Sequence, residues 1–163
     1  SGSAVEEVGA EAVMAFSKYF KLHEFTDSDY ALRQGLDNTP PADIIGNLRQ
    51  LADTMDIVRR LLGHPVLISS GFRAPKINAG VGGSKSSYHM LGLACDFKCP
   101  GFGTPAEVCN KLTIHAEQIS YDKIILEFGA WTHLQIPKND ASPRMLAFTI
   151  KSAAVGYLPG ILA

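Results

Sequence analysis

A long apolar run with helical spacing, between Asp43 and Gly63, constrains the fold of this chain more than any other feature. Its apolar residues recur three or four positions apart, as on the buried face of a helix. They are Ile44, Ile45, Leu48, Leu51, Met55, Ile57, Val58 and Leu61. Gly63 follows the run, where glycine supplies the left-handed conformation that ends many helices. We therefore expect one long helix here, with an apolar face that the rest of the domain must cover.

Short β-branched and aromatic runs, bounded by turn residues, predict strands in the rest of the chain. They cover residues 65–69, 93–98, 123–128, 131–136 and 145–150. We expect the first to be buried, and the short turn at Gly129-Ala130 predicts that the third and fourth form a hairpin. The pattern favours an α+β domain, with a small, mainly antiparallel sheet and helices packed on one of its faces.

Three further segments have helical features. Apolar residues with helical spacing predict a helix over residues 5–20. Thr104 has the N-cap chemistry of another helix, over residues 105–119. Residues 21–41 are rich in turn residues, so we expect a surface loop with at most a short helix over residues 27–33.

Two segments give weaker patterns. Residues 74–88 are rich in Gly, Ser, Asn and Lys, which indicates a loop with one helical turn near Ile77. Residues 155–163 form an apolar tail to which the pattern assigns no place in the fold.

Length and charge exclude several classes of protein. At 163 residues the chain suits a single domain, and we assign residues 5–163 to it, with the opening residues 1–4 as an expression scar. A net charge of −1 leaves no basic stripe for nucleic acid. No stretch approaches the roughly 20 apolar residues that span a bilayer, and the first residues lack the pattern of a signal peptide. The expected expression scar leaves room for a native leader that was removed, so localisation stays open. We expect a monomer that neither binds nucleic acid nor inserts into a membrane.

The three cysteines, Cys95, Cys99 and Cys109, cannot all pair within one chain. A domain of this length does not need disulfides as its main support. We therefore expect free, buried thiols.

The most informative segment runs from Ser87 to Asp96. His89 ends a loop, Asp96 lies within the next strand, and Gly92 between them permits a turn, so the two side chains can converge. Zinc accepts imidazole nitrogen and carboxylate oxygen, and a catalytic site typically has three protein ligands and one open position. His133, on a strand of the hairpin, is the best candidate for the third ligand, and Trp131 and Gln135 share its face by strand alternation.

Each of these residues also has an ordinary explanation when taken alone. A single histidine such as His89 or His133 is more often a hydrogen-bonding residue than a ligand, and Asp96 could cap a strand or pair with a cation. We expect no ligand role for the remaining histidines, which lie in surface or helix-flanking contexts: His23, His64 and His115.

A rival metal site would use Cys95 and Cys99. It is disfavoured because Cys95 should face away from Asp96 in a strand. A structural thiolate site also needs four closed ligands, which three cysteines do not supply.

The combination of motifs resembles a known family. The motifs are Ser69-x-Gly71-Phe72-Arg73, Ser87-x-His89-x-x-Gly92-x-Ala94-x-Asp96 and Trp131-x-His133. In this order they resemble the zinc D-alanyl-D-alanine carboxypeptidases and murein endopeptidases, whose fold is shared with the hedgehog signalling domain. The similarity covers roughly residues 20–150 and is greatest to small phage and prophage members of that group.

The resemblance implies a role for each matching residue. His89, Asp96 and His133 would bind one Zn²⁺ per chain. Arg73 would be catalytic and substrate-binding, because a guanidinium can hold a substrate carboxylate or polarise the scissile carbonyl. Two further roles are implied. Ser87 would form a hydrogen bond to the substrate or to a metal ligand, and Trp131 would form a wall of the substrate pocket or simply pack.

Glu127 is the implied general base. Some relatives place this acid three residues before the last histidine, where this chain has Ala130. In the hedgehog-like arrangement the acid lies six residues before that histidine, and Glu127 matches this spacing. An ordinary surface glutamate on a hairpin is the alternative.

The implied activity is hydrolysis of peptide bonds in the stem peptides of bacterial peptidoglycan, by a D-Ala-D-Ala carboxypeptidase or an endopeptidase. A non-catalytic, hedgehog-like binding domain that keeps zinc is the alternative from another class. A phage virion-associated lysis component would use the same chemistry in another setting.

Overall fold

The structure is a computed structural model, and it describes residues 15–163. The expected expression scar at residues 1–4 and most of the expected helix over residues 5–20 lie outside the described residues. Among residues 15–163, no helix is long and apolar enough to cross a membrane.

The last part of the expected N-terminal helix is not helical. Residues 16–19 form bends, and the backbone N–H groups of Lys18 and Tyr19 donate to the carboxylate of Asp56 at 3.0 and 3.1 Å. That carboxylate satisfies donors which a helix would have used for its own turns. Phe16 and Phe20 of this segment are instead buried in the core.

Residues 21–41 contain two short helices where one at most was expected. They are α2 (Leu22–Thr26) and α3 (Asp29–Gln34). The expectation of a surface loop was wrong for α2, because Leu22 and Phe25 are fully buried. Two apolar residues three positions apart are too few to distinguish a single helical turn from a loop in the sequence.

The long central helix is confirmed as α4 (Ala42–Leu62). Gly63 ends it in the left-handed conformation, with φ at 67°. Its buried residues are Ile44, Ile45, Leu48, Leu51, Ala52, Met55, Val58 and Leu62. This apolar face packs into the core, as the spacing predicted.

The sheet has six strands in the order β1-β2-β4-β3-β5-β6. The strands are β1 (Leu67–Ser70), β2 (Ala94–Lys98), β3 (Lys123–Glu127), β4 (Trp131–Gln135), β5 (Leu146–Ile150) and β6 (Tyr157–Pro159). Neighbouring strands are antiparallel except β3 and β5, which are parallel. The expected hairpin of β3 and β4 and the mainly antiparallel sheet are confirmed.

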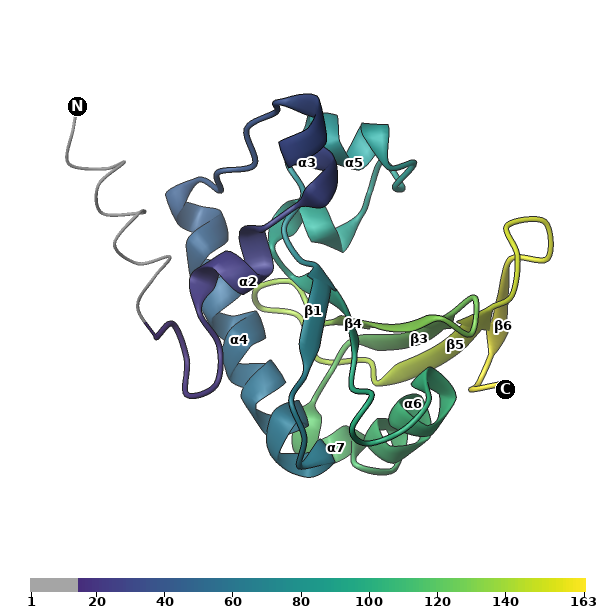
Figure 1. Cartoon of the computed structure of the whole chain (residues 1–163). Coiled ribbons are helices and arrows are strands. Elements are labelled where there is room, and N and C mark those ends of the chain that lie inside the picture. The colour runs from purple at the N-terminus through teal and green to yellow at the C-terminus, as the bar shows by residue number, and fades with distance from the viewer. Residues whose placement is uncertain (1–14) are drawn as a thin grey trace.

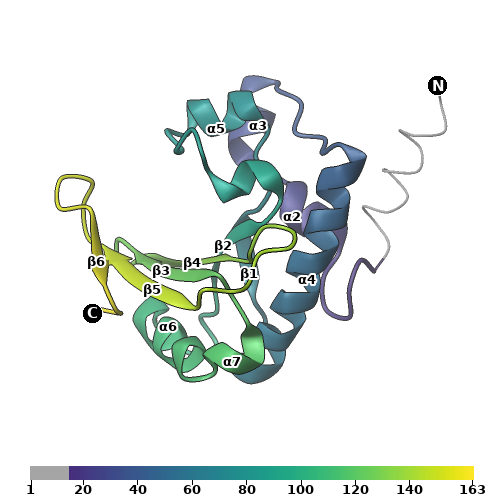
Figure 2. The same ribbon diagram turned by 180° about the vertical axis from the view of Figure 1, so that it is seen from behind.

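Both edges of the sheet differ from expectation. The strand expected to be buried, β1, is an edge strand that pairs only with β2, and Leu67 on it is 56% exposed. The apolar tail left without a place contains β6, the opposite edge, which pairs with β5. In Figures 1 and 2, β6 and α4 lie at opposite ends of the molecule. A β-branched run predicts a strand but does not reveal how many neighbours that strand has.

One face of the sheet is covered by helices. The expected helix over residues 105–119 is divided into α6 (Pro105–Ile114) and α7 (Ala116–Ile119), with a break at His115. Thr104 caps α6 as predicted, by accepting a hydrogen bond from the backbone N–H of Glu107 at 3.2 Å. Figure 1 shows α6 and α7 beneath the strands, with α4 alongside.

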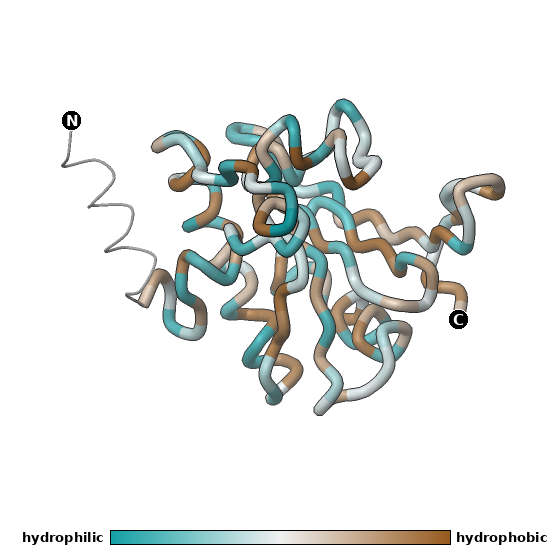
Figure 3. The backbone as a smooth tube through the Cα atoms, turned by 45° about the horizontal axis from the view of Figure 1, so that its top comes forward, coloured by the Kyte–Doolittle hydropathy of each residue, from teal (hydrophilic) through white to brown (hydrophobic). Residues whose placement is uncertain are grey.

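The segment above the opposite face contains α5 (Pro75–Gly80) and a 3₁₀ helix, η1 (Tyr88–Leu91). The expected turn near Ile77 is α5, and α3 lies beside it in Figures 1 and 2. In Figure 3, brown apolar stretches and teal hydrophilic stretches succeed one another along the backbone. The expected α+β fold class, with helices on one face of the sheet, is confirmed.

Candidate metal centre

Three elements bring His89, Asp96 and His133 together. Asp96 on β2 and His133 on β4 are direct partners in the sheet register, so their side chains project from the same face. His89 approaches from η1, which Gly92 ends with φ at 68°. A side chain at position 92 would also meet Ile44 Cγ2 at 2.8 Å, so the turn that joins η1 to β2 requires glycine.

The geometry of the three side chains fits a metal ion. Their ligand atoms all lie within 4.8 Å of one another, and all three residues are buried. Asp96 Oδ1 lies 3.0 Å from His133 Nδ1 and 3.4 Å from His89 Nε2. Ligands at zinc distances in a tetrahedral arrangement are separated by about 3.4 Å. Two imidazoles and one carboxylate, without a fourth protein ligand, are also the donor set of catalytic zinc sites.

The ring nitrogens of the two histidines that face away from the cluster also have hydrogen-bond partners. His89 Nδ1 donates to the carbonyl oxygen of Gly71 at 2.8 Å, and a Cβ at Gly71 would collide with the backbone of Phe25. His133 Nε2 lies 3.0 Å from Gln135 Oε1. Such partners on the outer ring nitrogen orient a histidine ligand and fix its tautomer.

The electrostatics of the cluster are asymmetric. Burial lowers the pKa of His89, and the nearby Asp96 carboxylate only partly offsets this effect. Burial also lowers the pKa of His133, but hydrogen bonding and charge attraction from Asp96 outweigh it, so that this pKa is raised. Burial disfavours the charged form of Asp96, yet its two histidine neighbours hold its pKa below the ordinary value. The carboxylate therefore stays charged, which favours a cation beside it.

The cluster lies in a cavity of about 590 Å³. All the residues that the sequence singled out as site residues line this cavity: Arg73, Ser87, His89, Asp96, Glu127, Trp131 and His133. Ala130 does not line it. The structure thus gathers the predicted residues around one space large enough for part of a peptide.

Glu127 lies beside the cluster of His89, Asp96 and His133. Its Oε1 atom is 3.7 Å from His133 Nδ1, and its Oε2 atom accepts a hydrogen bond from Trp131 Nε1 at 3.0 Å. Burial and the neighbouring charge of Asp96 raise the pKa of Glu127. Trp131 therefore both lines the pocket and fixes the orientation of this carboxylate.

Arg73 reaches the cluster from the loop after β1. Its guanidinium donates to Ser70 Oγ at 3.1 Å and to Asn78 Oδ1 at 3.2 Å, and it lies 3.4 Å from Asp96 Oδ2. Ser87 contacts the backbone of a cluster residue. Its hydroxyl accepts the backbone N–H of His89 at 3.2 Å and so caps η1.

A sequence model of the peptidase M15 family matches residues 18–135. The chain belongs to the peptidase M15 family. The matched part contains the His89–Asp96–His133 cluster, Arg73 and Glu127, and the peptidase family implies a peptide substrate. No curated protein matches the chain.

Sequence reasoning missed several residues of this M15 peptidase that support the site. Asn78 is buried and accepts a hydrogen bond from Arg73. Gln135 forms hydrogen bonds with His133 and Asp122. Asp122 in turn accepts a hydrogen bond from Arg144. The placement of Gln135 on the face of His133 was available from strand alternation. The contacts of Asp122 and Arg144 had no local signal in the sequence.

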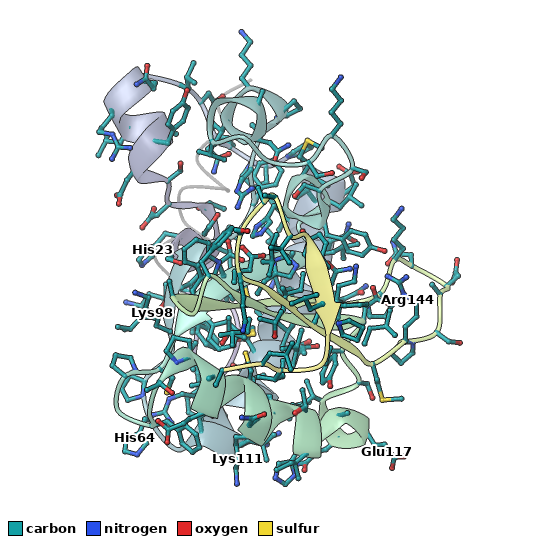
Figure 4. All side chains as sticks on the ribbon, turned by 90° about the vertical axis from the view of Figure 1, so that its right-hand side faces the viewer. His23, His64, Lys98, Lys111, Glu117 and Arg144 are labelled. Atoms are coloured by element: carbon teal, nitrogen blue, oxygen red, sulfur yellow. The ribbon has the colours of Figure 1, made fainter. Side chains whose placement is uncertain are left out.

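The other histidines and the cysteines of this M15 peptidase lie outside the cluster. In the described part of the chain, only the three residues already named form a group able to hold a metal. In Figure 4, His64 lies at the end of the molecule that carries Lys111 and Glu117. Cys95, Cys99 and Cys109 are free and buried, as expected, and Cys95 belongs to the core on the other face from Asp96.

Proposed function

We propose that this M15 peptidase is a zinc enzyme that hydrolyses peptide bonds in the stem peptides of bacterial peptidoglycan. The observation that carries the proposal is the meeting of His89, Asp96 and His133 within 4.8 Å in a cavity that also contains a half-buried acid, Glu127. A site that served structure alone would not need a carboxylate beside an open coordination position.

The proposed ligands are His89 through Nε2, His133 through Nδ1 and Asp96 through Oδ1. The distances of 3.0 and 3.4 Å from Asp96 Oδ1 to the two nitrogens support this assignment. A zinc ion held there would supply Lewis acidity, polarising a carbonyl group and lowering the pKa of a bound water toward 7.

Glu127 is the proposed general base. It accepts a proton from the attacking water and transfers it to the amine that leaves, which requires a carboxylate with a raised proton affinity. The raised pKa of Glu127, caused first by burial, suits this task. The hydrogen bond from Trp131 leaves Oε1, the oxygen nearer the cluster, available for the water.

Arg73 is the proposed partner of the substrate's carbonyl oxygen. Its side chain lines the cavity, and its contacts with Ser70 and Asn78 hold the guanidinium in place before the substrate arrives. Donors fixed in advance stabilise charge that develops on an oxygen without having to reorganise. Ser87 acts mainly by holding η1, and its place at the cavity wall also allows contact with the substrate.

The shape of the space favours an endopeptidase over a carboxypeptidase. A second cavity of about 300 Å³ adjoins the first and shares Arg73, Val81 and Trp131 with it. A carboxypeptidase needs a closed end that holds a terminal carboxylate, whereas an endopeptidase must accommodate chain on both sides of the bond. Space that continues beyond Arg73 and Trp131 provides such room.

The test is digestion of purified peptidoglycan, with product identification by mass spectrometry. We expect the zinc-loaded protein to release peptides and a chelator to abolish the release. Glu127→Ala should keep stoichiometric zinc and lose at least about two orders of magnitude in rate. Retained activity in that variant would place the base elsewhere. A wild-type protein that binds zinc and releases no peptide would instead favour the hedgehog-like binding domain.

A further inference from the structure

A chain of side-chain hydrogen bonds leads from the proposed metal ligand His133 toward the surface. His133 Nε2 lies 3.0 Å from Gln135 Oε1, and Gln135 Nε2 donates to Asp122 Oδ2 at 2.9 Å. Arg144 then donates to both oxygens of Asp122, at 2.8 and 2.7 Å. Gln135 and Asp122 are 5% and 2% exposed, so neither can readily exchange these partners for water. Figure 4 labels Arg144, on the segment that leads into β5.

The chemistry of each group fixes which partner donates and which accepts in every hydrogen bond of this series. An ionised carboxylate only accepts hydrogen bonds, and the two bonds from Arg144 lower the pKa of Asp122. The Gln135 amide must therefore turn its NH₂ group toward Asp122, which leaves Oε1 facing His133. Because Oε1 can only accept, Nε2 of His133 must carry a proton and donate it.

The proton on Nε2 of His133 determines which of its nitrogens faces the proposed metal position with a free lone pair. A neutral imidazole with its proton on Nε2 has its lone pair on Nδ1. Nδ1 is the atom of His133 that lies 3.0 Å from Asp96 Oδ1 and faces the proposed metal position. The carboxylate of Asp122 thus determines, through one amide, which nitrogen of His133 is free to bind metal.

The two histidines of the cluster differ in the group that accepts the hydrogen bond from the outer ring nitrogen. His89 donates its outer Nδ1–H to a backbone carbonyl, that of Gly71, which no side-chain substitution removes. The equivalent bond of His133 depends on side chains, and substitution can therefore reverse it. Backbone hydrogen bonds keep Asp122 in register, because its N–H donates to Gln135 O at 2.8 Å and its C=O accepts from Leu146 N at 3.0 Å.

We infer that Gln135, Asp122 and Arg144 are positioning residues that hold His133 in the tautomer with Nδ1 free for the metal. The inference rests on the proposed metal site and adds to it the groups that fix one ligand. None of the three is a proposed ligand, base or carbonyl-binding residue.

The decisive variant is Asp122→Asn, measured by competition for zinc with a chelator of known affinity. An asparagine can donate as well as accept, so the Gln135 amide can reverse and the His133 tautomer is no longer fixed. We expect zinc affinity to fall about 10- to 100-fold, the usual effect of losing an outer partner of a histidine ligand. Asp140→Asn is the matched control, an exposed aspartate that lies before Arg144 in the chain, and it should bind zinc as the wild type does.

A second readout is independent of affinity. In the zinc-loaded wild type, nitrogen-correlated NMR spectra should show a slowly exchanging proton on Nε2 of His133 and none on Nδ1. In Asp122→Asn that proton should exchange faster. A merely structural role for Asp122 would lower the melting temperature of the metal-free variant while leaving zinc affinity and the Nε2 proton unchanged.

The outcomes separate this inference from the proposed function. A wild type that binds no zinc would contradict the proposed function. A wild type that binds zinc, with Asp122→Asn binding it equally tightly, would overturn the positioning role alone. If Asp122→Asn does not fold, the zinc affinity of Arg144→Gln tests the positioning role instead. The Arg144 side chain is 51% exposed, so this variant should fold and lose less zinc affinity than Asp122→Asn, about severalfold, and unchanged affinity would overturn the inference.

Discussion

The two faces of the sheet are built from alternating residues of the same strands, yet one face forms the apolar core and the other lines the cavity. On β2, Cys95 and Phe97 are fully buried in the apolar core, while Asp96 between them faces the cavity. On β4, Leu134 lies in the core and His133 faces the cavity. Strand alternation thus lets a single strand contribute to the core and to the candidate site without any change in backbone.

The faces also differ in what stabilises them. The core face is held by apolar burial between the sheet and the helices α6 and α7, which contributes to stability in proportion to the area removed from water. The cavity face buries polar groups, which is unfavourable unless each has a partner. In the described part of the chain every buried side-chain nitrogen and oxygen has one. Substitutions on the core face should therefore change stability, and those on the cavity face metal binding and activity.

The largest expected effect is on metal binding at the cavity face. His89→Ala removes one of three proposed ligands, so zinc affinity should fall about 100-fold or more and stoichiometric metal should be lost. Metal analysis after equilibrium dialysis measures the effect. His115→Ala is the control, since this histidine lies outside the cluster and its loss should leave the metal content unchanged. One zinc per chain in His89→Ala would overturn the ligand set.

The core face should give the largest change in stability. Phe97→Ala removes a fully buried ring and should lower the free energy of unfolding by about 3–5 kcal/mol. Lys98→Ala, on the exposed end of the same strand, should change it by less than about 0.5 kcal/mol. Urea unfolding of the metal-free proteins gives both values. An equally large loss of stability in Glu127→Ala would erase the contrast between the faces.

Some of this contrast could be predicted from the sequence and some could not. Strand alternation placed Gln135 on the face of His133, and helical spacing placed α4, because both signals are local. The exposure of β1 and the parallel pairing of β3 with β5 depend on which strands become neighbours. No local pattern encodes that choice.

Parts of the candidate site could also be predicted from the sequence, and other parts could not. The resemblance to zinc peptidases identified the cluster and Glu127 by motif, without any knowledge of the sheet order. The support behind His133 was missed because it joins residues distant in sequence. Asp122 is 13 positions from Gln135 and 22 from Arg144. Polar residues at such separations have no recognisable spacing until the strands are paired.

A smaller effect is expected from Trp131→Phe at the edge of the cavity. The substitution keeps an aromatic wall but removes the indole N–H that donates to Glu127 Oε2. A hydrogen bond to a charged group contributes about 1.5–3 kcal/mol, so kcat/KM should fall about 10- to 100-fold at most. Zinc content should not change. An unchanged pH–rate profile and rate would show that Glu127 does not depend on Trp131 for its orientation.

The smallest expected effect concerns the thiols of the core face. Burial raises the pKa of Cys109 to about 11 and raises that of Cys95 as well, and the thiolate is the reactive species. A thiol reagent at pH 8 should therefore modify neither residue in the native protein at a measurable rate. Raising the pH increases the thiolate fraction about tenfold per unit below the pKa, but the reagent still has to reach buried sulfur atoms.

Reaction with these thiols should consequently follow the opening of the core. Where opening and closing are fast relative to modification, the rate scales with the population of the open form. Phe97→Ala should then accelerate modification by about the factor that its loss of stability predicts, roughly 100-fold or more. Glu127→Ala, on the other face, should leave the rate unchanged. Rapid modification of the wild type, or equal acceleration by both substitutions, would mean that the two faces open together and that the sheet does not separate a sealed core from an accessible site.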